Sequence, residues 1–154
     1  MNARSILLTL VLGFFSVSAC YAADVNMGTW KLNDAKSKLT AGTPKNDTVV
    51  YATAGDDVKV TVDGVDGAGK PAHSEWTGKF DGKDCAVTGD PTADTRAYKI
   101  VDDHTLAMTV KKGGKITASG RIVVAADGKS RTVTVSGTDS KGKKFSSTAV
   151  YDKQ

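Results

Sequence analysis

Four kinds of side chain in this sequence could do chemistry: histidine, cysteine, aspartate and arginine. The two histidines, His73 and His104, fall in a strand and a turn, and neither has the spacing of a metal ligand to a second ligand. Aspartates recur at Asp63, Asp66, Asp81, Asp84, Asp90 and Asp94 without the regular spacing of a calcium loop. The sequence contains no nucleophile elbow, phosphate loop or dinucleotide fingerprint. We therefore expect a protein without enzymatic activity, metal or cofactor.

The arginines are the more informative group. In the strand pattern set out below, Arg96 and Arg131 share the parity of the apolar, inward-facing positions, whereas Arg121 has the opposite parity. An inward guanidinium could bind the carboxylate or phosphate of a ligand. The alternative is that both arginines lie at a rim near strand ends, with solvent or an aspartate as partner.

The N-terminal stretch reads as an export signal. Arg4 precedes an apolar run over residues 6–17, which is too short for a permanent transmembrane helix and is followed by small residues. Cleavage after Ala22 would release a soluble protein to the periplasm or the medium. However, "VSAC" also resembles a bacterial lipobox, in which an acylated Cys20 would anchor the protein to a membrane. We expect a signal peptide over residues 1–22 and one domain over residues 23–154.

Composition fits one exported domain. The chain has 154 residues and a net charge of +4, with Lys and Asp spread through the turns rather than clustered. Such a distribution is typical of a solvated surface, so we expect a monomer that does not bind nucleic acid and that meets a membrane only if Cys20 is acylated. Cys85 is the only cysteine of the predicted domain, and it therefore has no partner for an internal disulfide.

From Met27 onward, apolar and polar residues alternate with the period of β-strands. The pattern predicts strands over 28–33, 47–54, 57–64, 72–80, 83–88, 95–101, 104–111, 115–126, 130–138 and 143–152. A short helical turn within 34–40, capped by Asp34, is the only other element expected. Turn motifs such as "DGK", "GGK" and "KGK" separate the strands, and Asp-Gly favours tight hairpins.

Hairpin registers can be predicted from the requirement that apolar residues share one face. A turn at Asp81-Gly82 pairs Trp76 with Val87, and a turn at Asp127-Gly128 pairs Val124 with Arg131. A three-residue turn over 112–114 would pair Val110 with Ile116. Ten hairpin-linked strands with one apolar face and no helix to cover it must curl on themselves. We expect an all-β fold, a single up-and-down antiparallel β-barrel of 8–10 strands, in preference to a two-layer sandwich.

Both ends of the predicted barrel resemble a known group. "GTWKLN" at the first strand and "VYDK" at the last are similar to the lipocalins and fatty-acid-binding proteins, and the export signal makes the chain most similar to exported bacterial lipocalin-like proteins. The resemblance implies a barrel that encloses an apolar ligand. It departs from the intracellular fatty-acid-binding proteins at Ala149, where their final strand commonly carries an arginine that holds a carboxylate.

This resemblance implies a structural role for Trp30 at the closed end of the barrel. The candidate ligand-binding residues on the inner face are Tyr51, Trp76, Phe80, Tyr98, Met108, Phe145, Tyr151, Arg96 and Arg131. We expect an exported, non-catalytic carrier of a small hydrophobic or amphipathic, lipid-like ligand. The alternative function is an envelope-anchored lipoprotein with a filled barrel that interacts with a protein or glycan.

Overall fold

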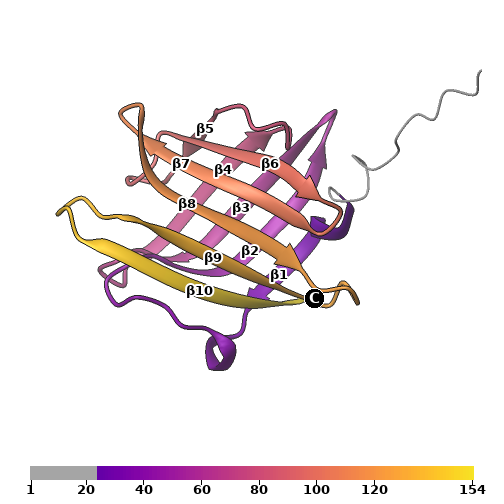
Figure 1. Cartoon of the computed structure of the whole chain (residues 1–154), viewed down its shortest axis with the longest axis horizontal. Helices are drawn as coiled ribbons and strands as arrows, with labels where there is room; N and C mark the ends of the chain where they lie inside the picture. The colour runs from indigo at the N-terminus through magenta and orange to yellow at the C-terminus, as the bar shows by residue number, and fades with distance from the viewer. Residues whose placement is uncertain (1–23) are drawn as a thin grey trace, which may run out of the picture.

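A computed structural model describes residues 24–154, so the predicted signal peptide and Cys20 lie outside the described residues. Ten antiparallel strands follow one another, each paired with the next, and β1 pairs with β10 to close the barrel (Figure 1). The strands are β1 (Gly28–Leu32), β2 (Lys45–Ala54), β3 (Asp57–Val65), β4 (Pro71–Gly78), β5 (Cys85–Thr88), β6 (Thr95–Asp102), β7 (Thr105–Lys112), β8 (Lys115–Val124), β9 (Ser130–Thr138) and β10 (Lys144–Lys153). The predicted all-β, up-and-down barrel is confirmed. Within this range no helix is long and apolar enough to cross a membrane.

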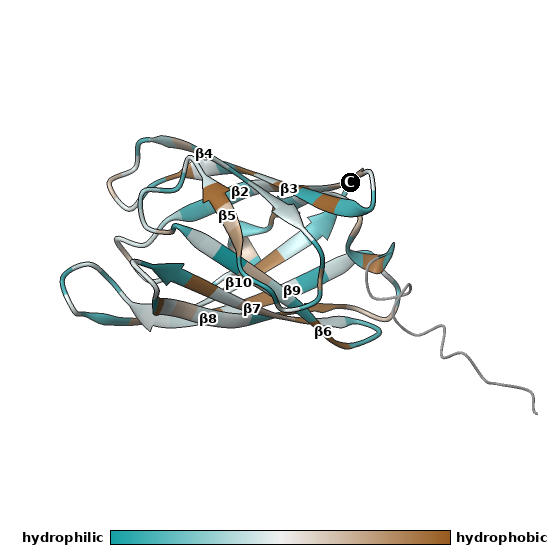
Figure 2. Ribbon diagram, turned by 90° about the horizontal axis from the view of Figure 1, so that it is seen from above, coloured by the Kyte–Doolittle hydropathy of each residue, from teal (hydrophilic) through white to brown (hydrophobic). Residues whose placement is uncertain are grey.

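The strand registers follow from the alternation of apolar and polar residues, which is visible along the ribbons in Figure 2. Trp76 pairs with Val87, and Val124 pairs with Arg131, as predicted. Across the barrel wall, inward positions form rows that run from strand to strand. One such row joins Tyr98, Met108, Gly120 and Val135.

The predicted register of the β7–β8 hairpin is wrong. Gly113 and Gly114 both adopt positive φ angles (57° and 74°), which makes a two-residue turn between Lys112 and Lys115. A bulge after Val110 then restores the apolar face, so that Val110 pairs with Ala118 rather than with Ile116. Ile116 lies opposite Lys111 and is 65% exposed.

The predicted helical turn after β1 is a short 3-10 helix, η1 (Asp34–Lys36). Its cap is Asn33 rather than Asp34, because the Asn33 side chain accepts the amide of Lys36 (3.2 Å). The chain then runs beside β10, where Lys38 bridges to Thr148.

The two ends of the barrel differ. At one end, which we call the closed end, a helical turn over 24–27 packs Val25 and Met27 against the core, and Asn26 is fully buried. The opposite end, which we call the mouth, carries the connection 33–44 and the turns 66–70, 89–94, 113–114 and 139–143. In Figure 1 the C-terminus lies at the closed end on the right, and the tips of the β7–β8 and β9–β10 hairpins lie on the left. Phe145, on an inward row near the mouth, is only partly buried.

Candidate ligand site inside the barrel

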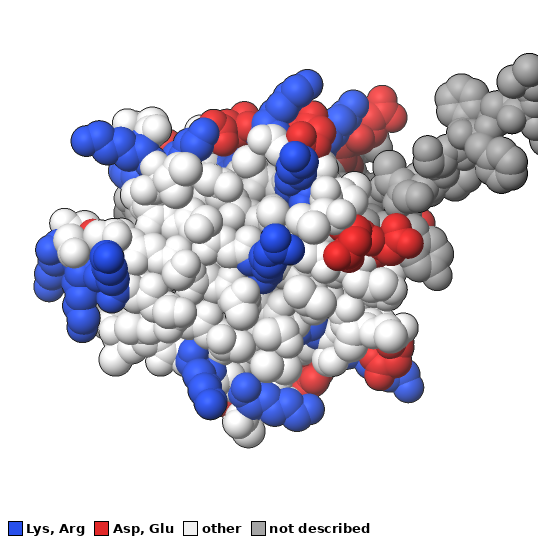
Figure 3. All heavy atoms as spheres, viewed as in Figure 1, with Lys and Arg blue, Asp and Glu red and all other residues white. Residues whose placement is uncertain are grey.

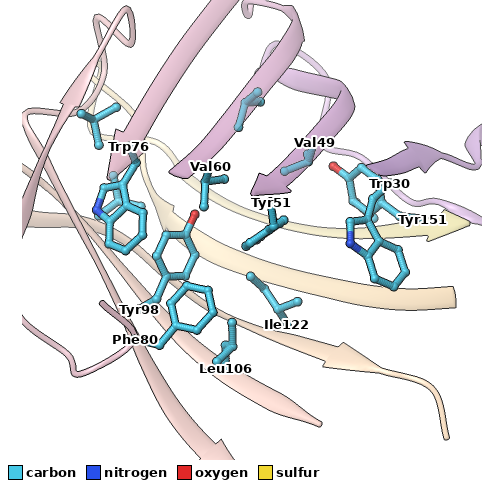
Figure 4. Packing of buried hydrophobic residues seen from close by; sticks show 14 of the residues in the cluster. Trp30, Val49, Tyr51, Val60, Trp76, Phe80, Tyr98, Leu106, Ile122 and Tyr151 are labelled. Atoms are coloured by element: carbon cyan, nitrogen blue, oxygen red, sulfur yellow. The ribbon is translucent and has the colours of Figure 1, made fainter. Parts of the chain in front are cut away.

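Aromatic side chains fill the middle of the barrel (Figure 4). Trp76 from β4 stacks on Phe80, with ring centroids 6.2 Å apart, and meets the edge of Tyr98 at 4.8 Å. Phe80 also contacts Tyr98 (5.8 Å) and Tyr51 (6.3 Å) edge to face. All four side chains are buried. These offset and edge-on contacts are the favourable geometries for aromatic pairs, and they make this part of the interior apolar and tightly packed.

Arg131 is the most deeply buried charged residue of the part of the chain that the structure describes. The turn at Asp127-Gly128 fixes the parity of β9 so that Arg131 faces inward, and only 2% of the residue is exposed. Its guanidinium carbon lies 4.7 Å from the ring centroid of Trp30, 4.9 Å from that of Tyr51 and 5.0 Å from that of Tyr151. We call these three rings the aromatic cage. Its contacts are cation–π interactions, which are strengthened by the exclusion of water.

The Arg131 cation has no acidic partner among the described residues. Its Nε and Nη1 atoms are buried and make no hydrogen bond there. The tyrosines cannot neutralise it, because burial raises the pKa of Tyr151 to about 12 and also raises that of Tyr51 against the lowering effect of Arg131. The Tyr151 hydroxyl donates instead to the carbonyl of Asn46 (3.0 Å). The cage therefore holds an uncompensated positive charge with two unused donor nitrogens, an arrangement that costs energy until an anion or acceptor is added.

Arg96 has a different environment, nearer the mouth. Its Nη2 atom pairs with Asp90 on the β5–β6 connection (3.3 Å), and its Nη1 atom lies 3.5 Å from the Tyr98 hydroxyl. The Arg96 carbonyl accepts the indole N–H of Trp76 (2.8 Å), which ties β4 to β6. Of the two alternatives drawn from the sequence, an aspartate partner near a strand end describes Arg96. Arg131 also lies near a strand end, but it is buried and has no acidic partner among the described residues.

Trp30 joins the cage to the N-terminal turn at the closed end. Its indole N–H donates to the carbonyl of Asn26 in the N-terminal turn (2.8 Å). The ammonium of Lys153, from β10, lies 5.1 Å from the Trp30 ring centroid and donates to the carbonyl of Val25 (3.4 Å). Sequence reasoning missed Lys153 and did not connect Asp90 with Arg96. Neither carries a local signal, because each acts only on segments that closure of the barrel brings beside it.

The remaining candidates lie closer to the mouth. Met108 and Phe145 are half-buried on inward rows, and so is Cys85 on β5. Two hollows of about 340 and 330 Å³ lie on the wall formed by β7 to β10, and Arg131 lines neither of them. His73 is exposed on β4 and bonds through Nδ1 to Asp63 (2.6 Å), a contact that raises the pKa of the imidazole.

The fold resembles that of redesigned small barrels. No protein-family model matches the sequence, and no curated protein matches it significantly. Among solved structures, the redesigned β-barrel mFAP1 bound to DFHBI is 18% identical, with a TM-score of 0.46 over 86% of this chain and 99% of that one. EF1p2_mFAP2b bound to DFHBI is 13% identical, with a TM-score of 0.51 over 89% of this chain and all of that one. At this identity the second likeness supports the barrel fold alone.

Proposed function

We propose that the protein is an exported, non-catalytic carrier that holds a small amphipathic ligand inside the barrel, with the anionic group of the ligand against Arg131. The observation that carries this proposal is the buried guanidinium with two unused donors. A carboxylate, sulfonate or phosphate oxygen would accept from Nε and Nη1 and neutralise the charge. The surrounding rings of Trp30, Tyr51 and Tyr151 would then exclude water from that pair.

The apolar part of the ligand would extend from the cage toward the mouth. It would pass the aromatic cluster, in which Tyr51 contacts Phe80 and Phe80 contacts Tyr98 and Trp76. It would then reach the half-buried Met108 and Phe145. Because the aromatic cluster is packed, the ligand must displace side chains such as Phe80 as it enters. Burial of its apolar surface supplies the free energy for this displacement, at about 25 cal/mol per Å². EF1p2_mFAP2b, which has a similar fold, binds the small molecule DFHBI, and the proposal places a small ligand in this barrel as well.

A matched pair of probes tests the proposal. Decanoate and decanol differ only in the head group, and binding of each can be followed by titration of the tryptophan fluorescence. The protein should bind decanoate more tightly, and Arg131→Met should remove the difference. Arg121→Met is the control, since Arg121 is exposed and has outward parity. Equal binding of both probes by the unmodified protein would refute the role of Arg131, whereas binding of neither would refute the carrier function.

The alternative function, that of an envelope-anchored lipoprotein with a filled barrel, also has an observation in its favour. The interior aromatic cluster is tightly packed, and the two hollows described above lie on the barrel wall. A filled barrel that contacts a protein or glycan through its outer surface would have these features. Native mass spectrometry of protein purified from its own cells separates the two functions: a stoichiometric small molecule supports the carrier, and a co-purifying macromolecule without one supports the alternative. A terminal peptide that begins at Ala23 or at an acylated Cys20 would establish the soluble or the anchored form.

A further inference from the structure

The hairpin topology brings lysines that are distant in the sequence to the same end of the barrel. Successive turns of an up-and-down barrel fall alternately at its two ends, so every second turn lies at the mouth. The β7–β8 and β9–β10 turns are both mouth turns, and together they carry Lys112, Lys115, Lys141, Lys143 and Lys144. In the sequence these residues look evenly mixed with aspartates, because the closed-end turn over 125–129, which carries Asp127, falls between them.

Four of these five lysines carry unneutralised charge. Lys112 pairs with Asp94 (2.7 Å), but Lys115, Lys141, Lys143 and Lys144 are exposed and make no ion pair within residues 24–154. Asp139 is the acid nearest in sequence to Lys141, Lys143 and Lys144, and its carboxylate accepts backbone amides of its own turn instead. Figure 3 shows basic side chains gathered at the left, where these hairpin tips lie, and acidic side chains toward the opposite end.

An apolar side chain lies within the same surface. Because the β7–β8 turn has two residues and is followed by a bulge, Ile116 lies opposite Lys111 and is 65% exposed. Ile116, Lys144 and the half-buried Phe145 line the same hollow of about 330 Å³. An exposed large apolar residue beside the free Lys115 and Lys144 combines the two interactions that hold a protein to an anionic bilayer.

We propose that the mouth of the barrel docks on a membrane surface that bears anionic lipid headgroups. The free lysines of the two hairpin tips supply the electrostatic attraction, and Ile116 inserts between the headgroups. A nucleic acid would satisfy the lysines but would gain nothing from an exposed isoleucine. The inference goes beyond the proposed function, and it requires neither a bound ligand nor acylation of Cys20.

Co-sedimentation with lipid vesicles tests the proposal directly. The protein should bind vesicles of phosphatidylglycerol and phosphatidylcholine at low salt, should not bind vesicles of phosphatidylcholine alone, and should dissociate at high salt. Each lysine near an anionic surface strengthens partition about fivefold. The triple variant Lys141→Gln, Lys143→Gln, Lys144→Gln should therefore weaken binding by about a hundredfold.

A charge-matched variant is the control. Lys79→Gln, Lys99→Gln, Lys129→Gln removes the same charge from exposed positions near the closed end and should leave vesicle binding nearly unchanged. Ile116→Ser should weaken binding to the vesicles while binding to a soluble polyanion, such as polyphosphate, stays the same. Failure to bind the anionic vesicles would overturn the proposal. Equal losses in the two triple variants would also overturn it, because only net charge would then matter, and so would an Ile116→Ser variant that binds vesicles as well as the unmodified protein.

Discussion

Replacement of Arg131 by methionine tests whether this residue binds a ligand or stabilises the fold. The two roles predict opposite signs for the change in the free energy of unfolding. Methionine fills a similar length of the cage but carries no charge. Three cation–π contacts would be lost, at about 1–2 kcal/mol each for desolvated groups. Two buried donors without acceptors would be removed, which relieves about 1–3 kcal/mol each.

One further effect favours the variant. Burial of an unpaired charge costs several kcal/mol beyond its missing hydrogen bonds, whereas methionine and the buried arginine stem remove similar apolar surface from water, so that exchange contributes little. We therefore expect Arg131→Met to be more stable than the unmodified, ligand-free protein by about 2 kcal/mol. For a domain of this size, that difference corresponds to a rise in Tm of roughly 8 °C.

Urea and thermal unfolding, followed by the fluorescence of Trp30 and Trp76 in a buffer without multivalent anions, measure this difference. Arg121→Met is the control and should stay within about 0.5 kcal/mol of the parent, since Arg121 is exposed. A loss of more than about 1 kcal/mol in Arg131→Met would refute the reasoning. It would mean that the cage stabilises the cation by more than its burial costs, and that Arg131 serves the fold.

Two further predictions concern the barrel wall and the buried phenols. Gly120→Ala should cost about 1–3 kcal/mol in urea unfolding, because its Cβ would overlap the carbonyl oxygen of Thr134, while the exposed neighbour Ser119→Ala should change little; a neutral Gly120→Ala would contradict the close approach of β8 and β9. Burial raises the pKa of Tyr151 to about 12, whereas the unfolded chain ionises near pH 10. The stabilising contribution of neutral Tyr151 is thus complete below pH 10 and is lost, by roughly 2–3 kcal/mol, as the pH rises from 10 to 12. Tyr151→Phe should reduce this loss in denaturation curves measured across that range, and identical pH profiles would argue against a buried, neutral phenol.

The sequence predicts most of the barrel because each strand carries its own alternation and each turn its own chemistry. The register of the Asp127-Gly128 hairpin, and with it the inward parity of Arg131, follows from residues close together in the chain. The predicted register of the β7–β8 hairpin is wrong for a specific reason. Gly113 and Gly114 permit a two-residue turn, and the compensating bulge leaves no local mark, so the exposure of Ile116 could not be foreseen.

The candidate site is less predictable, because parity gives the face of a residue and not its depth. Parity alone leaves Arg96 and Arg131 equivalent, yet one pairs with Asp90 near the mouth and the other lies inside the aromatic cage. The difference depends on the stagger of neighbouring strands around the closed barrel, a property of the whole chain. For the same reason the sequence does not predict the role of Lys153. Its contacts to Trp30 and Val25 join the last strand to the first strand and to the turn before it.

Closure of the barrel by β1 and β10 has a kinetic consequence. On one edge of β1, Trp30, Lys31 and Leu32 pair with Lys153, Asp152 and Tyr151, which follow them by about 120 residues in the chain. The aromatic cage likewise takes one ring from the start of the domain and another from its end. Pairing of such distant segments makes folding slow. The barrel consequently cannot close in the nascent chain until residues 151–153 have been synthesised.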